Sequence, residues 1–321
     1  MNMDASTPIT RPVSEKDTSR TVIDTSVERV TGLDSHQTEE FLAVEEPLEI
    51  QLAYGPSGAR AMKSISVTMR TPGHDFELAA GFLMTEGVVL DANDIDKIVY
   101  ATENTAPIPG EIQKRSFALP YQPRKNIVRV ELASSVEVSL ANLERNFYTT
   151  SSCGICGKAS LLALQTVCPP RATNTFSIDA DIVYTLPSRL RQAQRVFDRT
   201  GGLHGAGLFD AKGQLLGLRE DVGRHNAVDK LLGSEFLADR TPLRNSLLLL
   251  SGRASFELLQ KALMGGVSMV AAVGAPSSLA VQVAREFDII LVGFLRDDHF
   301  NIYHGAKHIQ RRAPDGREVR T

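Results

Sequence analysis

The 321-residue chain lacks the sequence features that are typical of nucleic-acid-binding, membrane and secreted proteins. Its net charge is −3 and it has no strongly basic block, so the charge balance does not suggest nucleic-acid binding. No apolar run approaches the ~20 residues that a membrane-spanning helix needs. The N-terminus lacks the basic and then apolar pattern of a signal peptide. We therefore expect no nucleic-acid partner and no membrane partner.

Cysteine is scarce as well. The chain has three cysteines, Cys153, Cys156 and Cys168, and this odd number argues against a disulfide-stapled secreted protein. Disulfides are rare where the compartment is reducing. We expect the protein to be cytoplasmic.

Several nucleotide and metal motifs are missing. The sequence contains no Walker phosphate loop and no G-x-G-x-x-G fingerprint. The zinc set of deaminases, His-x-Glu with Pro-Cys-x-x-Cys, is also absent: His204 is followed by Gly205-Ala206, and Cys153 is preceded by Ser152. We expect no structural metal.

The feature that organises the chain is a pair of cysteines, Cys153 and Cys156, within residues 148–158. The serines just before them can cap a helix that we predict over residues 158–165. A thiol at a helix N-terminus meets unpaired N–H groups and the positive end of the helix dipole, and Lys158 adds positive charge. These effects favour thiolate, so at least one of the two cysteines is predicted to be a nucleophile at neutral pH.

Three other interpretations of the cysteine pair compete with a sulfur-carrying nucleophile. A zinc half-site needs two further ligands, and beyond Cys168 no second Cys-x-x-Cys or paired histidine motif follows. A thioredoxin-type dithiol normally follows a strand, whereas a polar Thr/Ser loop precedes this pair. The third interpretation is a glycine-rich turn with incidental thiols. We favour the sulfur-carrying nucleophile.

The N-terminal half predicts a tail and a small domain. Residues 1–38 are rich in Ser, Thr, Asp and Arg and poor in large apolar side chains, which predicts a disordered tail. Residues 39–145 predict a small α+β domain with a mainly antiparallel sheet. Its expected elements are strands at 42–52 (broken at Pro47), 63–70, 95–100 and 127–132, and a helix at 76–84. We expect His74 and Asp75 to cap that helix.

The C-terminal half predicts an α/β domain over residues 146–310, which carries the cysteine pair, and a tail over 311–321. Continuous apolar strands alternate here with helices, which indicates a parallel sheet covered on both faces. The expected strands are 204–209, 214–219, 246–250, 268–273 and 288–294, and the expected helices are 187–197, 226–232, 256–264 and 279–286.

Polar residues collect where these strands end. Ser251 and Arg253 follow one strand and Ser277 follows the next. Turns that place a serine at a helix N-terminus accept phosphate oxygens through backbone N–H groups. Arg253 and Arg296 add fixed positive charge with bidentate reach. Together they predict a site for an anionic ligand.

Another strand-to-helix corner holds Arg224 and His225, the position at which α/β proteins bind ligands. We count both residues, with His204 at the start of its strand, as candidate binding residues. The alternative is structural, with Asp221 and Arg224 forming an ion pair that caps the helix.

The stretch Ser152–Lys158 resembles the cysteine motif of the FdhD family, the formate dehydrogenase accessory sulfurtransferases. The likeness spans about residues 45–309 and follows long motifs in the same order. These motifs are residues 70–75, 81–87, 220–230, 251–257, 275–280, 293–296 and 300–303.

The resemblance implies that Cys153 receives sulfur from a cysteine desulfurase as a persulfide, with Cys156 as the second cysteine. It implies that the sulfur passes to the molybdenum bis-molybdopterin guanine dinucleotide cofactor of formate dehydrogenase. It also implies a homodimer and a cytidine-deaminase-like, three-layer C-terminal domain without zinc. The alternative within this family is a non-catalytic chaperone that binds the molybdenum cofactor.

A cofactor-binding stretch is also implied by the resemblance. It comprises Phe294, Leu295, Arg296, Asp297, Asp298 and His299. The chain departs from the family at Asp297-Asp298-His299, where more basic residues are expected. Less positive charge there weakens the expected phosphate contact.

Overall fold

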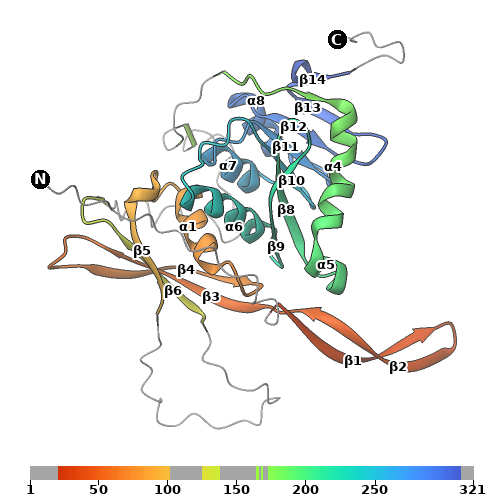
Figure 1. Ribbon diagram of the computed structural model, residues 1–321, viewed down its shortest axis with the longest axis horizontal. Coiled ribbons are helices and arrows are strands. Elements are labelled where there is room, and N and C mark those ends of the chain that lie inside the picture. Colours follow the sequence, from red (N-terminus) through yellow and green to blue (C-terminus); the bar gives the residue numbers. More distant parts are fainter. Residues whose placement is uncertain (1–20, 102–124, 138–163, 166–167, 169–172, 312–321) are drawn as a thin grey trace, which may run out of the picture.

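A computed structural model describes residues 21–101, 125–137, 164–165, 168 and 173–311 (Figure 1). The chain begins there with a two-stranded antiparallel ribbon, β1 (Val22–Thr31) and β2 (Asp34–Ala43), that projects from the body of the molecule. Gly32, with a φ of 65°, lies in the tight turn between the two strands. The predicted disordered tail over residues 1–38 is therefore wrong from residue 22 onward. The ribbon is polar because both of its faces are exposed, and its amino-acid composition is therefore similar to that of a disordered segment.

A four-stranded sheet follows, with the strand order β4-β3-β6-β5. Its strands are β3 (Glu46–Tyr54), β4 (Ala61–Arg70), β5 (Ile95–Tyr100) and β6 (Ile127–Leu132). Helix α1 (Asp75–Thr85) and the short 3-10 helix η2 (Ala92–Asp94) connect β4 to β5. The expected strands and helix are confirmed, except that β3 is not broken at Pro47. The pairing of β3 with β6 begins only at Glu49, so the missing N–H of Pro47 removes no bond on that side.

The larger sheet has six strands in the order β13-β12-β11-β10-β8-β9. They are β8 (His204–Phe209), β9 (Leu215–Asp221), β10 (Leu247–Leu250), β11 (Met269–Ala272), β12 (Ile290–Gly293) and β13 (Asn301–His304). Only β10, β11 and β12 are mutually parallel. β8 and β13 run antiparallel to their neighbours. The predicted parallel sheet is thus confirmed only at its centre, because the short connection between β8 and β9 permits only an antiparallel pair.

Helices cover both faces of this sheet. Helix α4 (Ala180–Ala193) is continued by α5 (Arg195–Thr200), and α6 (Arg224–Leu237), α7 (Phe256–Met264) and α8 (Ser278–Glu286) complete the set. Leu247 and Leu249 of β10 pack in the same core as α4, and Leu248 and Leu250 pack in the core of α6, α7 and α8. The result is a three-layer α/β arrangement (Figure 1).

Helix α4 differs from the sequence prediction, which begins it at Pro187. The helix starts at Ala180 and contains Pro187 in its interior. Val183, Leu186 and Leu190 form a fully buried stripe on the sheet. This burial outweighs the one backbone hydrogen bond that the proline removes.

Two small elements close the described chain. β14 (Ile309–Gln310) follows the 3-10 helix η3 (Ala306–His308). It pairs in parallel with β7 (Ile178–Asp179), which lies just before α4. No helix in the described ranges combines the length and the apolar character that crossing a membrane requires.

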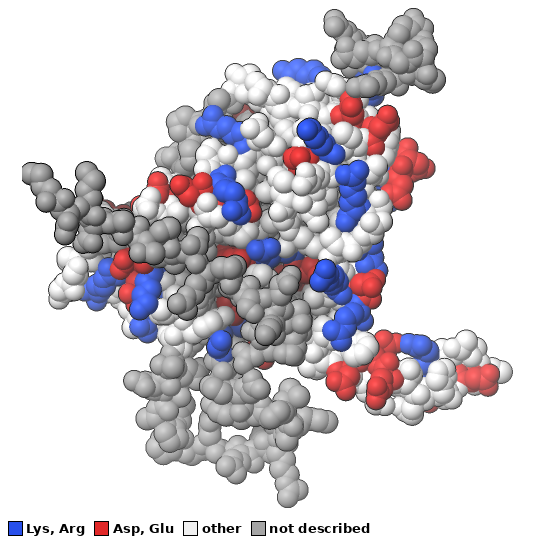
Figure 2. Space-filling view, in the orientation of Figure 1, with Lys and Arg blue, Asp and Glu red and all other residues white. Residues whose placement is uncertain are grey.

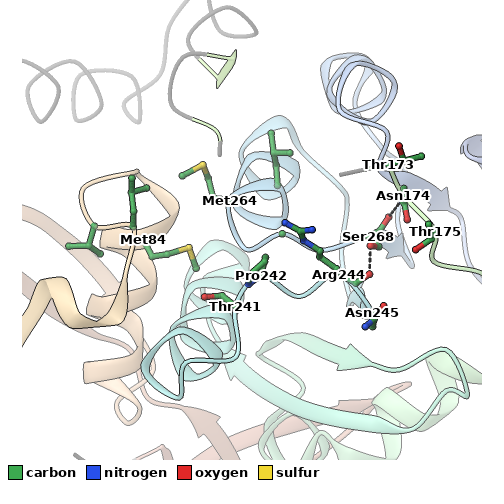
Figure 3. Close-up of a pocket in the computed structure, with 14 residues that line it drawn as sticks. Met84, Thr173, Asn174, Thr175, Thr241, Pro242, Arg244, Asn245, Met264 and Ser268 are labelled. Atoms are coloured by element: carbon green, nitrogen blue, oxygen red, sulfur yellow. Dashed lines mark hydrogen bonds between the residues drawn. The ribbon is translucent and has the colours of Figure 1, made fainter. Parts of the chain in front are cut away.

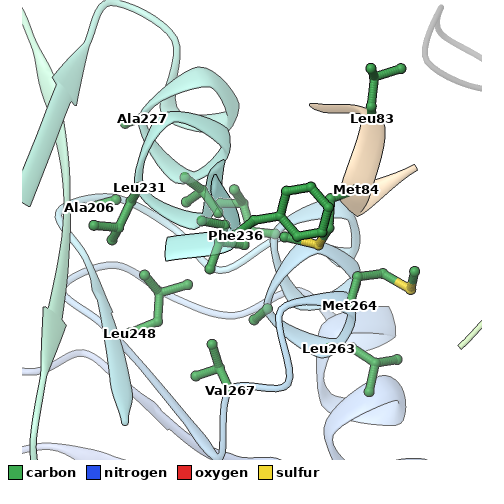
Figure 4. Close-up of a cluster of buried hydrophobic side chains, with 14 of the residues drawn as sticks. Leu83, Met84, Ala206, Ala227, Leu231, Phe236, Leu248, Leu263, Met264 and Val267 are labelled. Atoms are coloured by element: carbon green, nitrogen blue, oxygen red, sulfur yellow. The ribbon is translucent and has the colours of Figure 1, made fainter. Parts of the chain in front are cut away.

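The two halves of the chain share one hydrophobic core. Leu83 and Met84 of α1 lie in the same buried cluster as Phe236 of α6 and Leu263 of α7 (Figure 4). α1 crosses α6 so closely that a Cβ on Gly81 would lie 1.9 Å from the carbonyl oxygen of Asp229. The small sheet, α1 and α6 are therefore stacked on the large sheet as consecutive layers.

Candidate functional site

The carboxyl ends of β10, β11 and β12 share one edge of the large sheet, which we call the carboxyl edge. β8 runs antiparallel to β10, so its first residue, His204, lies at the same edge and pairs with Asp221 at the end of β9. The Ser251 hydroxyl accepts the Gly205 N–H at 2.9 Å. The edge therefore brings together His204, Ser251 and the start of α6 with Arg224, as the sequence predicts.

The turns after β10 and β11 lie side by side at this edge. The Gly252 carbonyl accepts the Gly274 N–H at 2.9 Å, and Ala254 forms a parallel bridge with Pro276. A Cβ at position 274 would lie 2.9 Å from the backbone of Arg253, so this approach requires glycine. The two serine-containing turns are parts of one surface.

Three helices begin at the carboxyl edge, and their N-termini differ in what they leave open. The Ser277 hydroxyl caps α8 by accepting the Ala280 N–H at 3.2 Å. At the starts of α6 and α7, Gly223 and Ser255 make no side-chain capping bond in the described structure. The first N–H groups of α6 are therefore available to an anion, whereas the start of α7 already holds the Glu257 carboxylate, which accepts its own backbone N–H.

The stretch Phe294–His299 reaches the same edge, but some of its side chains are exposed there and others are buried. Phe294 donates its N–H to the Gly274 carbonyl at 3.1 Å, has a φ of 52° and is 41 % exposed. Leu295 is fully buried in the core, so its side chain packs away from any ligand.

The charged members of this stretch are less suited to an anion than the sequence suggests. The Arg296 guanidinium donates to the Val273 carbonyl at 2.6 Å and to its neighbour's carbonyl at 2.8 Å. The exposed Asp298 carboxylate lies 2.6 Å from Nδ1 of His299. Asp297 adds a second exposed carboxylate. The positive charge of Arg296 is therefore directed at backbone carbonyls.

The structural alternative for Arg224 is wrong, because Asp221 pairs with another residue. Its carboxylate lies 2.6 Å from the Lys230 ammonium, and both side chains are buried. Asp221 also accepts the N–H groups of Thr71 and Gly223 at 3.1 and 2.8 Å. In the described part of the chain the buried Nε of Arg224 has no hydrogen-bond partner. Arg224 is therefore available to the site.

Two histidines at the edge are uncharged at neutral pH. Burial lowers the pKa of His225 to about 4, and the positive charges of Lys261 and Arg224 act in the same direction. Burial and the charge of Arg224 also lower the pKa of His204. His225 Nε2 lies 4.0 Å from a Glu257 carboxylate oxygen, which offsets part of the shift. Neutral imidazoles there offer hydrogen bonds without adding charge.

The lowered pKa of His225 predicts a pH dependence of stability. The folded protein binds this proton more weakly than the unfolded chain, so the contribution is complete above about pH 6.5 and is lost as the pH falls toward 4. We expect the thermal midpoint of the wild-type protein to fall more steeply over that window than the midpoint of His225→Gln. Differential scanning calorimetry of both proteins measures this, and curves that stay parallel would contradict it.

The motif at residues 70–75 serves the junction between the halves of the chain rather than the cap of α1. Arg70 is buried and binds both carboxylate oxygens of Asp75 at 3.0 Å. His74 occupies the N-cap position, but its side chain makes no capping bond and lies 2.9 Å from the Glu77 carboxylate. The prediction that His74 and Asp75 cap the helix is therefore wrong for their side chains.

Helix α6 is held against this junction by its own polar residues. The Lys230 ammonium donates to the Thr71 carbonyl at 2.7 Å, and the Asn226 amide donates to the Met69 carbonyl at 2.7 Å. Both side chains are buried. These contacts fix the orientation of α6 and thereby the position of Arg224 and His225 at its start.

Sequence reasoning gave no role to two residues of α7 that shape the site. Glu257 faces His225, and the buried Lys261 ammonium lies 3.0 Å from Asp229 and 3.3 Å from Glu86. The available signal was their spacing, since residues four apart share one helix face. Their charges set the electrostatics behind His225.

Cys153 and Cys156 lie outside the described residues, as does most of the helix predicted over 158–165. The chain that follows them is anchored at the opposite, amino edge of the large sheet. Asn174 donates to the carbonyls of Ser268 and Asp288, just before β11 and β12, at 2.9 Å each. Eleven residues from Cys153 to Leu164 span at most about 40 Å when extended, and a four-residue strand spans about 13 Å. Chain length therefore permits the thiol to reach either edge.

A cavity of about 470 Å³ lies at this amino edge and away from the predicted site residues (Figure 3). Met84, Leu263 and Met264 supply apolar walls, and Asn174 and Ser268 lie at its polar side. Among the residues that the structure describes, no group of three or more His, Cys, Asp or Glu side chains could hold a metal ion. The site chemistry thus concentrates at the carboxyl edge.

Comparison with known proteins adds a family to this geometry. The model of the FdhD/NarQ family matches residues 43–310. A sulfur carrier protein FdhD from Streptomyces coelicolor is 49% identical over 277 residues, which cover 86% of this chain and 91% of that protein. A sulfur carrier protein FdhD from Saccharolobus solfataricus is 33% identical over 281 residues, covering 88% of this chain and 95% of that protein.

A solved structure has the same fold. A crystal structure described as a formate dehydrogenase accessory protein from Desulfotalea psychrophila aligns with a TM-score of 0.64 and 22% sequence identity. The alignment covers 90% of this chain and 99% of that chain. At this identity the likeness concerns the fold alone.

Proposed function

This chain belongs to the FdhD/NarQ family, and from that membership we propose that it is a sulfur carrier required for formate dehydrogenase activity. One observation carries the proposal: the family match runs over residues 43–310 and so includes the cysteine pair, the junction and the carboxyl edge. Relatives that cover more than four fifths of the chain are named sulfur carriers.

In the proposed reaction the Cys153 thiolate attacks the outer sulfur of a persulfide on a cysteine desulfurase. The sulfur–sulfur bond of the donor breaks, the donor cysteine leaves as thiolate, and Cys153 holds the sulfur as a persulfide. A thiolate at neutral pH is required for the attack, and the predicted helix start and Lys158 favour it. Cys156, the second cysteine of the motif, is proposed as the second thiol when the sulfur leaves.

The proposed acceptor is the molybdenum bis-molybdopterin guanine dinucleotide cofactor, bound as substrate at the carboxyl edge. The open N-terminus of α6, Arg224 and Arg253 suit its phosphates. Neutral His204 and His225 can donate or accept hydrogen bonds there. Arg296 contributes less than expected, because its guanidinium is bound to backbone carbonyls.

A prediction follows for phosphate recognition. Arg253 is exposed on the turn after β10, so Arg253→Gln is expected to keep the fold and to lose a charge-assisted hydrogen bond. We expect the affinity for guanosine diphosphate, a fragment of the cofactor, to fall about tenfold. Isothermal titration calorimetry measures it, with Arg285→Gln on α8 as the matched control. Equal affinities for both variants would contradict the proposed position of the phosphates.

The proposed partners are a cysteine desulfurase as donor, formate dehydrogenase as recipient of the sulfurated cofactor, and a second copy of the chain. The chain has only three cysteines, an odd number, and this supports the cytoplasm as its compartment. The alternative is a non-catalytic chaperone that binds the molybdenum cofactor while the cysteines only shape a loop.

A labelling experiment separates the two functions. A desulfurase is supplied with cysteine that carries radioactive sulfur, and label is followed through this protein to formate dehydrogenase. A carrier acquires label that thiol reductants release and then passes it on. A chaperone stays unlabelled while it stimulates formate dehydrogenase, and that result would replace the proposed function.

A further inference from the structure

The ribbon β1–β2 is the part of the described molecule whose side chains the fold covers least. No residue from Val22 to Ala43 is buried. Its exposed large apolar side chains are Ile23, Val30, Leu33, Phe41 and Leu42. A lone two-stranded hairpin is marginally stable in water, and clustered exposed apolar residues mark interaction surfaces. The ribbon therefore has the properties of an arm that lies against another surface.

The charged side chains on one face of the ribbon are all acidic. The register pairs Asp24 with Phe41, Ser26 with Glu39 and Glu28 with Gln37, so these side chains share one face with Val30. That face holds three carboxylates and no basic side chain. The only arginine of the ribbon, Arg29, lies on the opposite face and pairs with Glu40.

The acidic face touches its own copy only at the base of the ribbon. The Arg199 guanidinium of α5 lies 4.8 Å from the centre of the Phe41 ring. Beyond this contact the ribbon extends away from the described body of the molecule (Figure 1), and Glu28 and Glu39 are exposed. A surface for the outer part of the arm must come from another molecule.

The molecule itself presents a surface of matching chemistry. α4 and α5 expose four arginines, Arg189, Arg191, Arg195 and Arg199, and two carboxylates, Asp181 and Asp198. Arg191 pairs with Asp198 at 3.0 Å and Arg199 lies over Phe41 of the same copy, so the surface carries a net positive charge with Arg195 the most open of the four. Figure 2 shows mainly acidic residues along the ribbon, and basic residues interspersed with acidic ones over the body beside it. A ten-residue strand spans about 34 Å and a fourteen-residue helix about 21 Å. The arm is therefore long enough to cover α4 and the start of α5.

We propose that the ribbon of one copy lies with its acidic face along α4 and α5 of a second copy, and that the second copy returns the same contact. Such a reciprocal contact obeys two-fold symmetry and closes after two chains. Glu28 and Glu39 meet Arg195 and Arg191, and Arg191 then exchanges Asp198 of its own copy for the ribbon carboxylate. Val30 and Leu33 cover the apolar stems of the arginines. The contact rests on the homodimer of the proposed function and specifies how it is built.

Two charge-reversal variants and their mixture test the contact. Glu28→Lys/Glu39→Lys changes the ribbon, and Arg191→Glu/Arg195→Glu changes the helices. Sedimentation equilibrium at several protein concentrations is expected to show a wild-type dimer and at least tenfold weaker self-association of each variant. Mixing the variants restores dimers, because one contact then joins lysine to glutamate and the other keeps the native charges. Asp34→Lys, on the other face, and Arg285→Glu, on α8, are matched controls that stay dimeric.

Three results would overturn the proposal: a monomeric wild-type chain, variants with unchanged dimer affinity, or a mixture that does not recover dimers. Far-UV circular dichroism and thermal midpoints verify that each variant is folded. The ribbon variants still acquire sulfur at Cys153 if only the dimer contact is lost. Failure of the sulfur-carrier function would instead leave the dimer intact and remove that sulfur.

Discussion

Gly233→Ala is expected to cost this protein most of its stability. A Cβ at position 233 would lie 1.9 Å from the carbonyl oxygen of Glu77, and the reciprocal position, Gly81, would meet the carbonyl of Asp229 at the same distance. Both obstacles are backbone atoms of a facing helix, so no side chain can rotate away. Ordinary overpacking costs about 1–3 kcal/mol, and separating two helices adds lost burial, so we expect about 4 kcal/mol or more.

Urea denaturation followed by circular dichroism measures this cost. Gly58→Ala is the matched control, because nothing lies within 4 Å of the Cβ that it adds. The free energy of unfolding of Gly58→Ala should stay within about 0.5 kcal/mol of the wild-type value. If Gly233→Ala were equally harmless, α1 and α6 would not cross at the distance that the structure shows.

The same crossing links stability to the site. α6 begins with Arg224 and His225 and is held to the small sheet through Asn226 and Lys230. Any shift of α1 therefore moves the helix N-terminus that we assign to the phosphates. This arrangement explains why the motifs at residues 70–75 and 220–230 are far apart in sequence and adjacent in the fold.

Cys153→Ala is expected to abolish the support of formate dehydrogenase while the protein remains folded. Without the thiol there is no atom to form the persulfide, so formate dehydrogenase activity in a strain that lacks the native carrier should fall at least about 100-fold, because little of the enzyme receives sulfurated cofactor. The activity assay is accompanied by urea denaturation, which should show an unchanged midpoint.

The matched control for this experiment is Cys168→Ala. Cys168 packs against the hydrophobic core, and its removal should lower stability modestly and leave formate dehydrogenase activity near the wild-type level. Full activity of Cys153→Ala, with the protein present at normal abundance, would exclude this cysteine as the carrier.

Much of the fold could be predicted because the strong local signals agree with it. The apolar runs at residues 246–250, 268–273 and 288–294 become the parallel centre of the large sheet, and the turns after them gather at one edge. Ser251 and Arg253 could be placed at one edge because the ends of parallel strands share an edge. His204 begins its strand and joins them only because β8 runs antiparallel to β10, which the sequence analysis did not predict.

The remaining features depend on contacts that a single sequence does not specify. Asp221 pairs with Lys230 rather than with Arg224, because α6 directs the Lys230 ammonium toward the buried carboxylate. Pro187 stays inside α4 because the buried stripe around it outweighs one lost bond. Leu295 enters the core although its neighbours reach the edge. Each choice is made by tertiary packing.

The ribbon β1–β2 is a second case in which the local sequence does not determine the structure. Residues 22–43 have the polar composition of a disordered segment, yet alternate well enough to pair along their whole length. Composition indicates that these residues form no core, and it does not indicate whether they pair with one another. The register of β1 with β2 distinguishes the ordered ribbon from a tail.

The most direct measurement of the central claim is mass spectrometry of the protein after incubation with a cysteine desulfurase and cysteine. The account predicts that the peptide containing Cys153 gains the mass of one sulfur atom, that a thiol reductant removes it, and that the peptide containing Cys168 is unchanged. A Cys153 peptide without added sulfur, while the desulfurase itself is loaded, would contradict the account.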